Sequence, residues 1–245
     1  EGEQIQLKFA LSPVSSAGAM KNLEAEIPHW DFNKVKEETK QKWNSELAKI
    51  EVETLTEDDK ITFYTAMYHT NLSPILYEDA DGQYRGLDQN IHQSEGFTNY
   101  TIFSLWDTYR ALHPLFNITQ PKRNNDMIKS MLAHHDESVH NMLPIWSHYA
   151  NENWCMIGYH ATSVIADAMA KNVGDFDHER ALQASVNTAN VRYFDGLGDY
   201  IDYNYVPDDL SHSSVSKTLE YAYNDWCIAQ MAKQVGDTSI EEEFL

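Results

Sequence analysis

Apolar and aromatic residues recur at spacings of three and four along most of the chain after residue 30, which is the period of an amphipathic α-helix. One such stripe contains Val35, Trp43, Leu47 and Ile50, on a helix that opens near Asp31. The same period predicts further helices over residues 61–72, 103–112, 125–135, 156–171, 178–192 and 215–235. The pattern therefore predicts a mainly α chain, with roughly half of the residues in helices.

Two short segments depart from the helical period. The stretch Ile5–Ser12 alternates apolar and polar residues, which predicts a half-buried strand. Because a single strand is not stable alone, its partner must lie elsewhere in the chain or in an upstream segment. Asp81-Gly82, between Ile75–Tyr77 and Gln83–Arg85, predicts a β-hairpin.

The two ends of the sequence suggest a piece of a longer polypeptide. The chain opens on Glu1 rather than Met, and Glu1-Gly2-Glu3-Gln4 is polar, so no signal peptide is recognised here. At the other end, Gly236 is a natural stop for the last long helix. The following acidic stretch, Glu241–Leu245, is typical of the first turn of a further helix, so we expect the natural chain to continue.

The charge balance disfavours several classes of partner. With 18 Lys and Arg against 38 Asp and Glu, the formal net charge is −20. Such a surface repels nucleic acids and anionic membranes, whereas a neutral ligand such as a sugar, or a cation, fits better. Simple solubility explains the same charge equally well. There is no apolar run of about 18 residues, so no membrane-spanning segment is expected.

Common catalytic and metal-binding motifs are absent from the sequence. The phosphate-binding glycine loops, the GxSxG elbow, HExxH and paired CxxC motifs do not occur, and the two cysteines, Cys155 and Cys227, cannot form a disulfide framework. The loop Asp79–Asp88 resembles part of an EF-hand, but Tyr77 stands at its first ligand position and Asp88 replaces the bidentate Glu. A hairpin turn is the better interpretation, and a calcium-binding protein built on this loop is a weak alternative.

The segment Phe103–Arg110 is a candidate sugar platform. It places Trp106, Asp107 and Arg110 within five residues, near a helix start. An aromatic ring can stack on the C–H face of a sugar, while Asp and Arg form paired hydrogen bonds with its hydroxyls. The alternative is a helix cap together with a structural ion pair.

Glu152 is a candidate proton donor. It lies among Asn, Trp and apolar residues in the segment Leu143–His160, and burial beside Trp would raise the pKa of its carboxyl group. The alternative is a negative charge at the start of the predicted helix 156–171, where it would favour the helix dipole. Glu220 and Asp225, on the predicted helix 215–235, are interpreted as charges on a helix face.

Together these segments resemble glycoside hydrolase family 92, a family of bacterial exo-acting α-mannosidases. The matching stretches are Asp81–Gly86, Phe103–Arg110 with His113–Leu115, Cys155–His160 and Ser214–Tyr223. The resemblance implies an N-terminal β-sandwich followed by an (α/α)6 barrel. Residues 1–30 would then be a strand and linker from the sandwich, and residues 31–245 the first part of the helical barrel, truncated at its C-terminal end.

The resemblance also implies a mechanism, in which calcium (Ca2+) contacts the sugar and the anomeric configuration is inverted. Glu152 aligns with the general acid, and Trp106, Asp107 and Arg110 fall in the sugar-binding region. His212 stands where members specific for α-1,2 linkages carry a His-Glu pair, but Ser213 replaces that Glu. The general base of the family lies in a later motif that does not occur before Leu245, so we expect the base outside this chain. The sequence does not identify the calcium ligands.

The sequence thus predicts a fragment of a calcium-dependent, inverting exo-α-mannosidase, with mannose-containing glycans as its substrates. By the same resemblance, the protein would be secreted, periplasmic or at the bacterial cell surface. We expect the isolated chain to be inactive, and to bind the rest of its own domain or to self-associate. The alternative is a helical carbohydrate-binding protein without catalytic activity.

Overall fold

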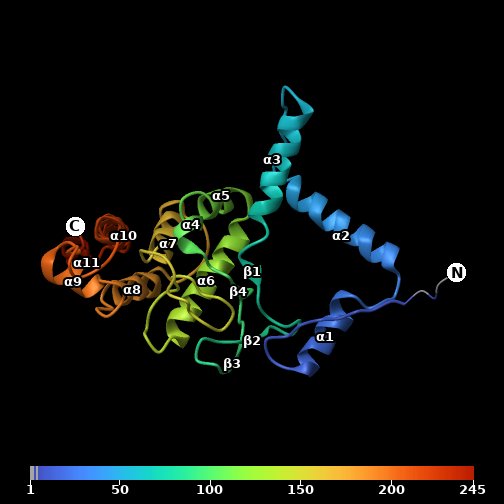
Figure 1. The fold of residues 1–245 in the computed structure, drawn as a ribbon, viewed down its shortest axis with the longest axis horizontal. Coiled ribbons are helices and arrows are strands. Elements are labelled where there is room, and N and C mark those ends of the chain that lie inside the picture. Colours follow the sequence, from blue (N-terminus) through green and yellow to red (C-terminus); the bar gives the residue numbers. More distant parts are fainter. Residues whose placement is uncertain (1–2, 4) are drawn as a thin grey trace.

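The computed structural model describes residue 3 and residues 5–245 of the chain. Most of the secondary structure in these residues is α-helical (Figure 1). Four short strands accompany the helices. The mainly α-helical class predicted from the hydrophobic period is therefore confirmed. The sandwich, the barrel and the division at residue 31 remain predictions. In the described residues, no helix is both long and apolar enough to cross a membrane.

The first three helices are α1 (Ser16–Glu26), α2 (Phe32–Leu47) and α3 (Glu57–Thr70). Asp31 begins α2 as predicted, because its carboxylate accepts a hydrogen bond from the Lys34 amide at 3.0 Å. Figure 1 shows α2 and α3 extending away from the remaining helices. Helix α2 fully buries no residue and α3 buries only Met67, but the two helices pack on each other, with the ring centres of Trp43 and Tyr68 4.6 Å apart.

The four strands form two small antiparallel pairs. Strand β1 (Ile75–Leu76) pairs with β4 (Tyr100–Thr101), and β2 (Gln83–Arg85) pairs with β3 (Ile91–Gln93). The predicted turn at Asp81-Gly82 is present, since the Gly82 amide donates to Asp79 O at 2.8 Å and Gly82 has a φ of 79°. The predicted pairing across that turn is wrong.

The buried carboxylate of Asp79 joins this turn to the N-terminal part of the chain. Ser12 Oγ donates to Asp79 Oδ2 at 2.6 Å, and Asn22 Nδ2 donates to Asp79 Oδ1 at 2.8 Å. These bonds fasten the turn to α1 and to the segment before it. Before the turn, the Tyr77 amide donates to Asn99 O at 2.8 Å, which extends the pairing of β1 with β4.

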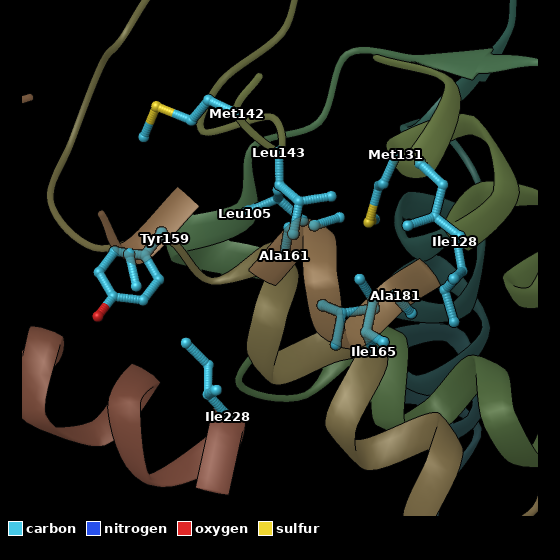
Figure 2. Close-up of a cluster of buried hydrophobic side chains, with 14 of the residues drawn as sticks. Leu105, Ile128, Met131, Met142, Leu143, Tyr159, Ala161, Ile165, Ala181 and Ile228 are labelled. Carbon is cyan, nitrogen blue, oxygen red and sulfur yellow. The ribbon is translucent and has the colours of Figure 1, made fainter. Parts of the chain in front are cut away.

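The remaining helices pack around one apolar core (Figure 2). They are α4 (Leu105–Thr108), α5 (Leu112–Thr119), α6 (Pro121–Glu137), α7 (Ala161–Ala170), α8 (His178–Ala189), α9 (Leu197–Tyr203), α10 (Ser214–Val235) and α11 (Thr238–Glu243). Leu105, Met131, Ile165 and Ile228 are at most 1% exposed, and they bring α4, α6, α7 and α10 together. Burying each such side chain contributes about 1.5–3 kcal/mol.

The predicted helix over residues 103–112 is wrong in its bounds, because α4 covers only Leu105–Thr108 and α5 begins at residue 112 and continues to Thr119. Pro114 explains the break, because a proline in the interior of a continuous helix would clash with the carbonyl of Arg110. In the structure Pro114 lies in the first turn of α5, where a missing amide costs little. The backbone at Ala111, with φ −143° and ψ −37°, separates the two helices.

The predicted strand over Ile5–Ser12 is not a strand in the structure. Ile5, Leu7, Phe9 and Leu11 are 75–87% exposed, and no described strand pairs with this segment. An unpaired strand is not stable, so the alternating pattern alone could not produce one. Part of the predicted linker is helix α1, and residues 1, 2 and 4 of the 1–30 prediction lie outside the described residues.

The prediction that the acidic stretch Glu241–Leu245 forms the first turn of a further helix is also wrong. Helix α10 ends at Gly236 in the left-handed conformation, with a φ of 85°, as predicted. The next helix, α11, begins at Thr238, because Asp237 accepts hydrogen bonds from the Ser239 and Ile240 amides. Glu241–Glu243 therefore end this helix instead of opening one.

Candidate active site

Helix α4 carries the predicted sugar platform, and its Trp106 contacts α10. Trp106 Nε1 donates to Glu220 Oε1 at 3.1 Å. Arg110 Nη2 lies 4.0 Å from the same oxygen. The Arg110 guanidinium also lies over two rings, 5.5 Å from the centre of Trp106 and 4.8 Å from that of Tyr109. Two of the three predicted platform residues therefore share one carboxylate.

Asp107, the third platform residue, is exposed in α4. Ser104 Oγ donates to Asp107 Oδ2 at 2.5 Å. Of the alternative interpretation, the ion pair is present, between Arg110 and Glu220 of α10, whereas the N-terminus of α4 has no side-chain cap. The carboxylate of Asp107 retains capacity to accept hydrogen bonds from a ligand.

His160 brings the start of α7 to the same place. His160 Nε2 lies 2.6 Å from Glu220 Oε2, and Asn224 Nδ2 lies 3.1 Å from His160 Nδ1. The Tyr109 ring stacks on His160 at 3.9 Å between centres, with 7° between the planes. Burial lowers the pKa of His160, although Glu220 opposes this by favouring the charged imidazole.

The loop that holds Glu152 is built around its carboxylate. Glu152 Oε1 accepts from the amides of Trp146 at 2.8 Å and Trp154 at 2.9 Å, and Oε2 accepts from Ile145 at 3.0 Å. Burial raises the pKa of Glu152, while these backbone donors oppose the increase by stabilising the anion. The group is a half-buried acid with a raised pKa, as the sequence predicted.

The alternative interpretation of Glu152, a charge at a helix N-terminus, is wrong. Helix α7 begins at Ala161, five residues later than the predicted start at residue 156. The loop instead carries local strain, because Tyr149, Trp154 and Met156 have φ values of 56°, 55° and 67°. Bulky residues seldom adopt this left-handed region, and such strain concentrates at functional sites.

Hydrogen bonds join the Glu152 loop to the segment that leads into α4. The Phe103 amide donates to Ser147 O at 3.1 Å, and Ser147 forms an antiparallel bridge with Glu152. From the β2–β3 hairpin, Gln89 Nε2 donates to Ala150 O at 2.7 Å. The candidate acid and the Trp106 platform therefore stand on one connected backbone framework.

His212 is exposed in the loop before α10. No hydrogen bond or ion pair among the described residues joins it to Trp106, Glu152 or Glu220. The nearby Lys217 is buried, and its Nζ donates to Asp195 Oδ1 at 2.7 Å and Ser211 Oγ at 2.8 Å. The structure therefore does not add His212 to the cluster around Glu220.

The described residues do not supply a metal cage. Among them, no group of three or more His, Cys, Asp or Glu side chains could hold a metal ion. The acidic residues of the EF-hand-like loop already have protein partners: Asp79 binds Ser12 and Asn22, and Asp88 accepts from Asn90 at 2.7 Å. A calcium ion does not fit this loop as a cage of clustered carboxylates.

The sequence alone did not single out His160 and Glu220, which lie together next to Trp106. The sequence places His160 only at the end of the matching stretch Cys155–His160, and it indicates for Glu220 a charge on a helix face. They are 60 residues apart, and no local pattern reports that α7 and α10 pack together. The only available signal was that both lie within the stretches that resemble a known family.

Comparison with known proteins points to a single family of enzymes. A model of the glycosyl hydrolase family 92 catalytic domain matches residues 18–245. Among solved structures, a family GH92 α-mannosidase from Bacteroides thetaiotaomicron is 52% identical over 96% of this chain and 31% of its own, with a TM-score of 0.92. The same α-mannosidase in complex with mannoimidazole is 53% identical over 96% of this chain and 30% of its own, with a TM-score of 0.90.

Two more distant relatives extend this range. A family GH92 inverting mannosidase from Bacteroides thetaiotaomicron is 31% identical over 95% of this chain and 32% of its own, with a TM-score of 0.87. A protein of Arthroderma benhamiae, described as an uncharacterized secreted glycosidase, is 27% identical over 95% of this chain and 28% of its own length. The chain thus spans less than a third of the length of each of these relatives.

Proposed function

The chain belongs to glycosyl hydrolase family 92, and from that premise we propose that it is part of an exo-acting enzyme that removes α-linked mannose from glycans. A relative that is 53% identical binds mannoimidazole, which supports a mannose-type ligand. The observation that carries the proposal is the half-buried Glu152 carboxyl, with its raised pKa, on a framework shared with Trp106.

Glu152 would act as the general acid. A carboxyl group with a raised pKa retains a proton at higher pH and can donate it to the leaving glycosidic oxygen. The three backbone amides hold the carboxyl group in one orientation. Donation from a fixed position lowers the barrier because less reorganisation is needed during the reaction.

An inverting reaction needs a second carboxylate as the base, roughly 6.5–9.5 Å from the acid. We propose that this base is supplied from outside the 245 residues. On this basis the isolated chain does not hydrolyse mannosides. One relative is named as an inverting mannosidase, which supports inversion here.

The sugar would be held by the platform residues. The indole of Trp106 offers a face for stacking, while Asp107 and Arg110 are exposed and can bind hydroxyls. His212, also exposed, would contact the leaving sugar. We further propose secretion, supported by the relative described as a secreted glycosidase.

The requirement for calcium is a proposal that rests on the family resemblance alone. The described residues form no cluster of three or more His, Cys, Asp or Glu side chains that could hold the ion. Chelation tests the requirement directly. If calcium is needed, EGTA abolishes hydrolysis of α-mannosides and added Ca2+ restores it.

The experiment that tests the proposed function is the substitution Glu152→Gln in the α-mannosidase polypeptide that carries these residues. General-acid catalysis contributes about 10²–10⁴-fold, so kcat should fall by that order on α-mannobiose, whose leaving group is poor. An activated aryl α-mannoside needs less protonation and should be affected less. The matched control is Glu242→Gln, which changes the same functional group on the exposed surface of α11. An equal loss on both substrates would remove Glu152 from the role of acid.

A carbohydrate-binding protein without catalysis is the alternative. The cluster of Trp106, Arg110 and Glu220 favours it, because such a cluster can hold a sugar without a general base. If the polypeptide binds mannoimidazole but turns over neither substrate at any calcium concentration, this alternative is correct.

A further inference from the structure

The carboxylate of Glu220 lies where three elements meet. It extends from α10, and it contacts Trp106 of α4 through one oxygen and His160, at the start of α7, through the other. Its side chain is only 17% exposed, so both interactions are largely shielded from water. A carboxylate in this position can fix the arrangement of the groups around it.

We propose that Glu220 is a positioning residue, which holds the indole of Trp106 in the orientation that the sugar stacks against. The proposal rests on the proposed function for the identity of the ligand. We do not propose Glu220 as a catalytic residue, because its two carboxylate oxygens are hydrogen-bonded to Trp106 and His160.

The direction of the hydrogen bonds around His160 supports this role. The Tyr159 amide donates to Asn224 Oδ1 at 2.9 Å, which fixes the orientation of the Asn224 side-chain amide. Asn224 Nδ2 then donates to His160 Nδ1, so the neutral imidazole carries its proton on Nε2. The direction in which burial shifts the pKa of His160 agrees with a neutral ring.

It follows that the His160 Nε2–H donates to Glu220 Oε2. The other oxygen, Oε1, accepts from the Trp106 indole N–H. The carboxylate of Glu220 is therefore fixed by His160 on one side, through bonds that begin at the backbone amide of Tyr159. A rigidly held acceptor in turn holds the indole by its only polar atom.

Fixing the indole matters because stacking on a sugar depends on the orientation of the ring. Without an acceptor, the Trp106 N–H would turn toward water, and the ring face would be presented in several rotamers. Arg110 lies 5.5 Å from the indole centre and 4.0 Å from Glu220 Oε1, so removing the carboxylate also removes the ionic partner of that guanidinium. A small error in placement is enough to weaken binding and catalysis strongly.

The test uses the α-mannosidase polypeptide that carries these residues, labelled with 5-fluorotryptophan and observed by 19F NMR. The chain has six tryptophans, and the resonance of Trp106 is the one that Trp106→Phe removes. In Glu220→Ala, this resonance should shift and broaden while those of the other tryptophans within residues 1–245 stay in place. Glu220→Gln keeps one acceptor oxygen for the indole N–H but places an amide NH2 against the His160 Nε2–H, so it should restore only part of the original signal. An unchanged Trp106 resonance in Glu220→Ala would overturn the proposal.

Titration with mannoimidazole separates this proposal from the proposed function. Glu220→Ala should weaken binding about 10-fold, as expected for the loss of one charge-assisted hydrogen bond. In the Trp106→Phe background the same change should have a much smaller effect, because the indole donor is already absent. Equal effects in both backgrounds would show that Glu220 does not act through Trp106.

Two further results complete the design. Glu242→Ala removes one negative charge from exposed α11 and should change neither the Trp106 resonance nor the affinity. If the unaltered protein fails to bind mannoimidazole, the proposed mannose function is wrong. The resonance of Trp106 then still decides whether Glu220 holds the indole.

Discussion

At the scale of single residues, burial of titratable side chains produces a testable pH dependence. His113 is fully buried and His134 is 3% exposed, and burial lowers the pKa of each to about 4. An unfolded chain has a histidine pKa of about 6.5. Between these values the unfolded state binds a proton that the folded state does not, so the free energy of unfolding falls as the pH falls.

For His134 this loss is about 2 kcal/mol between pH 7 and pH 5. His134→Phe removes the titrating group and keeps an aromatic ring in the site, next to Phe103. The variant should lose about 2 kcal/mol less than the unaltered chain over that pH interval, measured by urea unfolding at both pH values. His69→Phe, at an exposed position of α3, is the control and should follow the unaltered chain. Parallel pH profiles for His134→Phe and the unaltered chain would contradict the prediction.

Asp107 allows binding and stability to be separated. Its side chain is exposed and its only described side-chain partner is Ser104, so Asp107→Ala should leave the thermal midpoint nearly unchanged. If Asp107 binds a sugar hydroxyl, the substitution should weaken mannose binding by about 1–3 kcal/mol. Calorimetric titration and thermal unfolding of the same preparation measure both quantities. A thermal midpoint that falls in step with affinity would assign Asp107 a structural role.

The sequence allowed individual site residues to be predicted only where the chemistry is local. Trp106 and Arg110 are four positions apart, and the environment of Glu152 is given by its immediate neighbours. The pairing of His160 with Glu220 depends on the packing of α7 against α10, which no short segment encodes. The direction of the Glu152 pKa was predictable, but its three amide donors were not, because they depend on how the loop closes.

At the scale of elements, prediction worked where a hydrophobic stripe coincided with a terminal signal. Asp31 and Gly236 mark the ends of α2 and α10 as their residue types predict. Helices α1 and α9 were missed, because α1 contains only two large apolar side chains, Met20 and Leu23, and α9 is a short helix within a polar, tyrosine-rich loop. The pairing of β1 with β4 was not predictable locally, since their partner residues are about 25 positions apart.

The β2–β3 hairpin depends on a close approach at Gly86. A methyl group there would lie 2.7 Å from Glu137 Oε2, 2.7 Å from His92 Cδ2 and 2.8 Å from Asp88 Oδ1. Glu137 is buried on α6 and accepts from Tyr84 Oη at 2.6 Å, so it cannot easily move away. Gly86→Ala should therefore displace the hairpin from α6 and cost about 1–3 kcal/mol of stability.

The hairpin also supports the Glu152 loop through Gln89, which donates to Ala150 O. Gly86→Ala should consequently speed hydrogen exchange at the Trp146 and Trp154 amides, which donate to Glu152. Gly96→Ala is the control for local backbone strain, because Gly96 has a φ of 77° but a methyl group there meets nothing within 4 Å. It should leave exchange in the Glu152 loop unchanged. If Gly86→Ala also leaves it unchanged, the hairpin does not support the acid.

At the scale of the whole molecule, the family could be recognised from a few stretches, whereas the architecture could not be derived from them. The helical class follows from the hydrophobic period, and the match over residues 18–245 establishes the family. The predicted barrel and sandwich require contacts beyond those described here. Exposed apolar side chains remain among the described residues, including Ile5, Leu7 and Phe9 near the N-terminal end, and Phe32 and Ile61 on α2 and α3.

Helix α10 carries the most instructive of these exposed apolar faces. Val215, Leu219 and Trp226 lie at spacings of four and seven, and are 73%, 66% and 52% exposed. Since these spacings place them on one side of the helix, they form a continuous apolar stripe. Such stripes favour association, whereas the net charge of −20 opposes it by repulsion between copies.

The balance between these two forces predicts that the purified chain self-associates, and that salt promotes the association. Raising the ionic strength from about 0.01 M to 0.5 M shortens the screening length from roughly 30 Å to under 8 Å, which weakens the repulsion but not the apolar contact. The mass measured by light scattering should therefore rise above 28.2 kDa as salt is added. Leu219→Glu interrupts the stripe and should lower this mass at every salt concentration. Leu55→Glu introduces the same charge at a fully exposed loop position and should have little effect. A monomer at all salt concentrations would show that the stripe on α10 does not drive association.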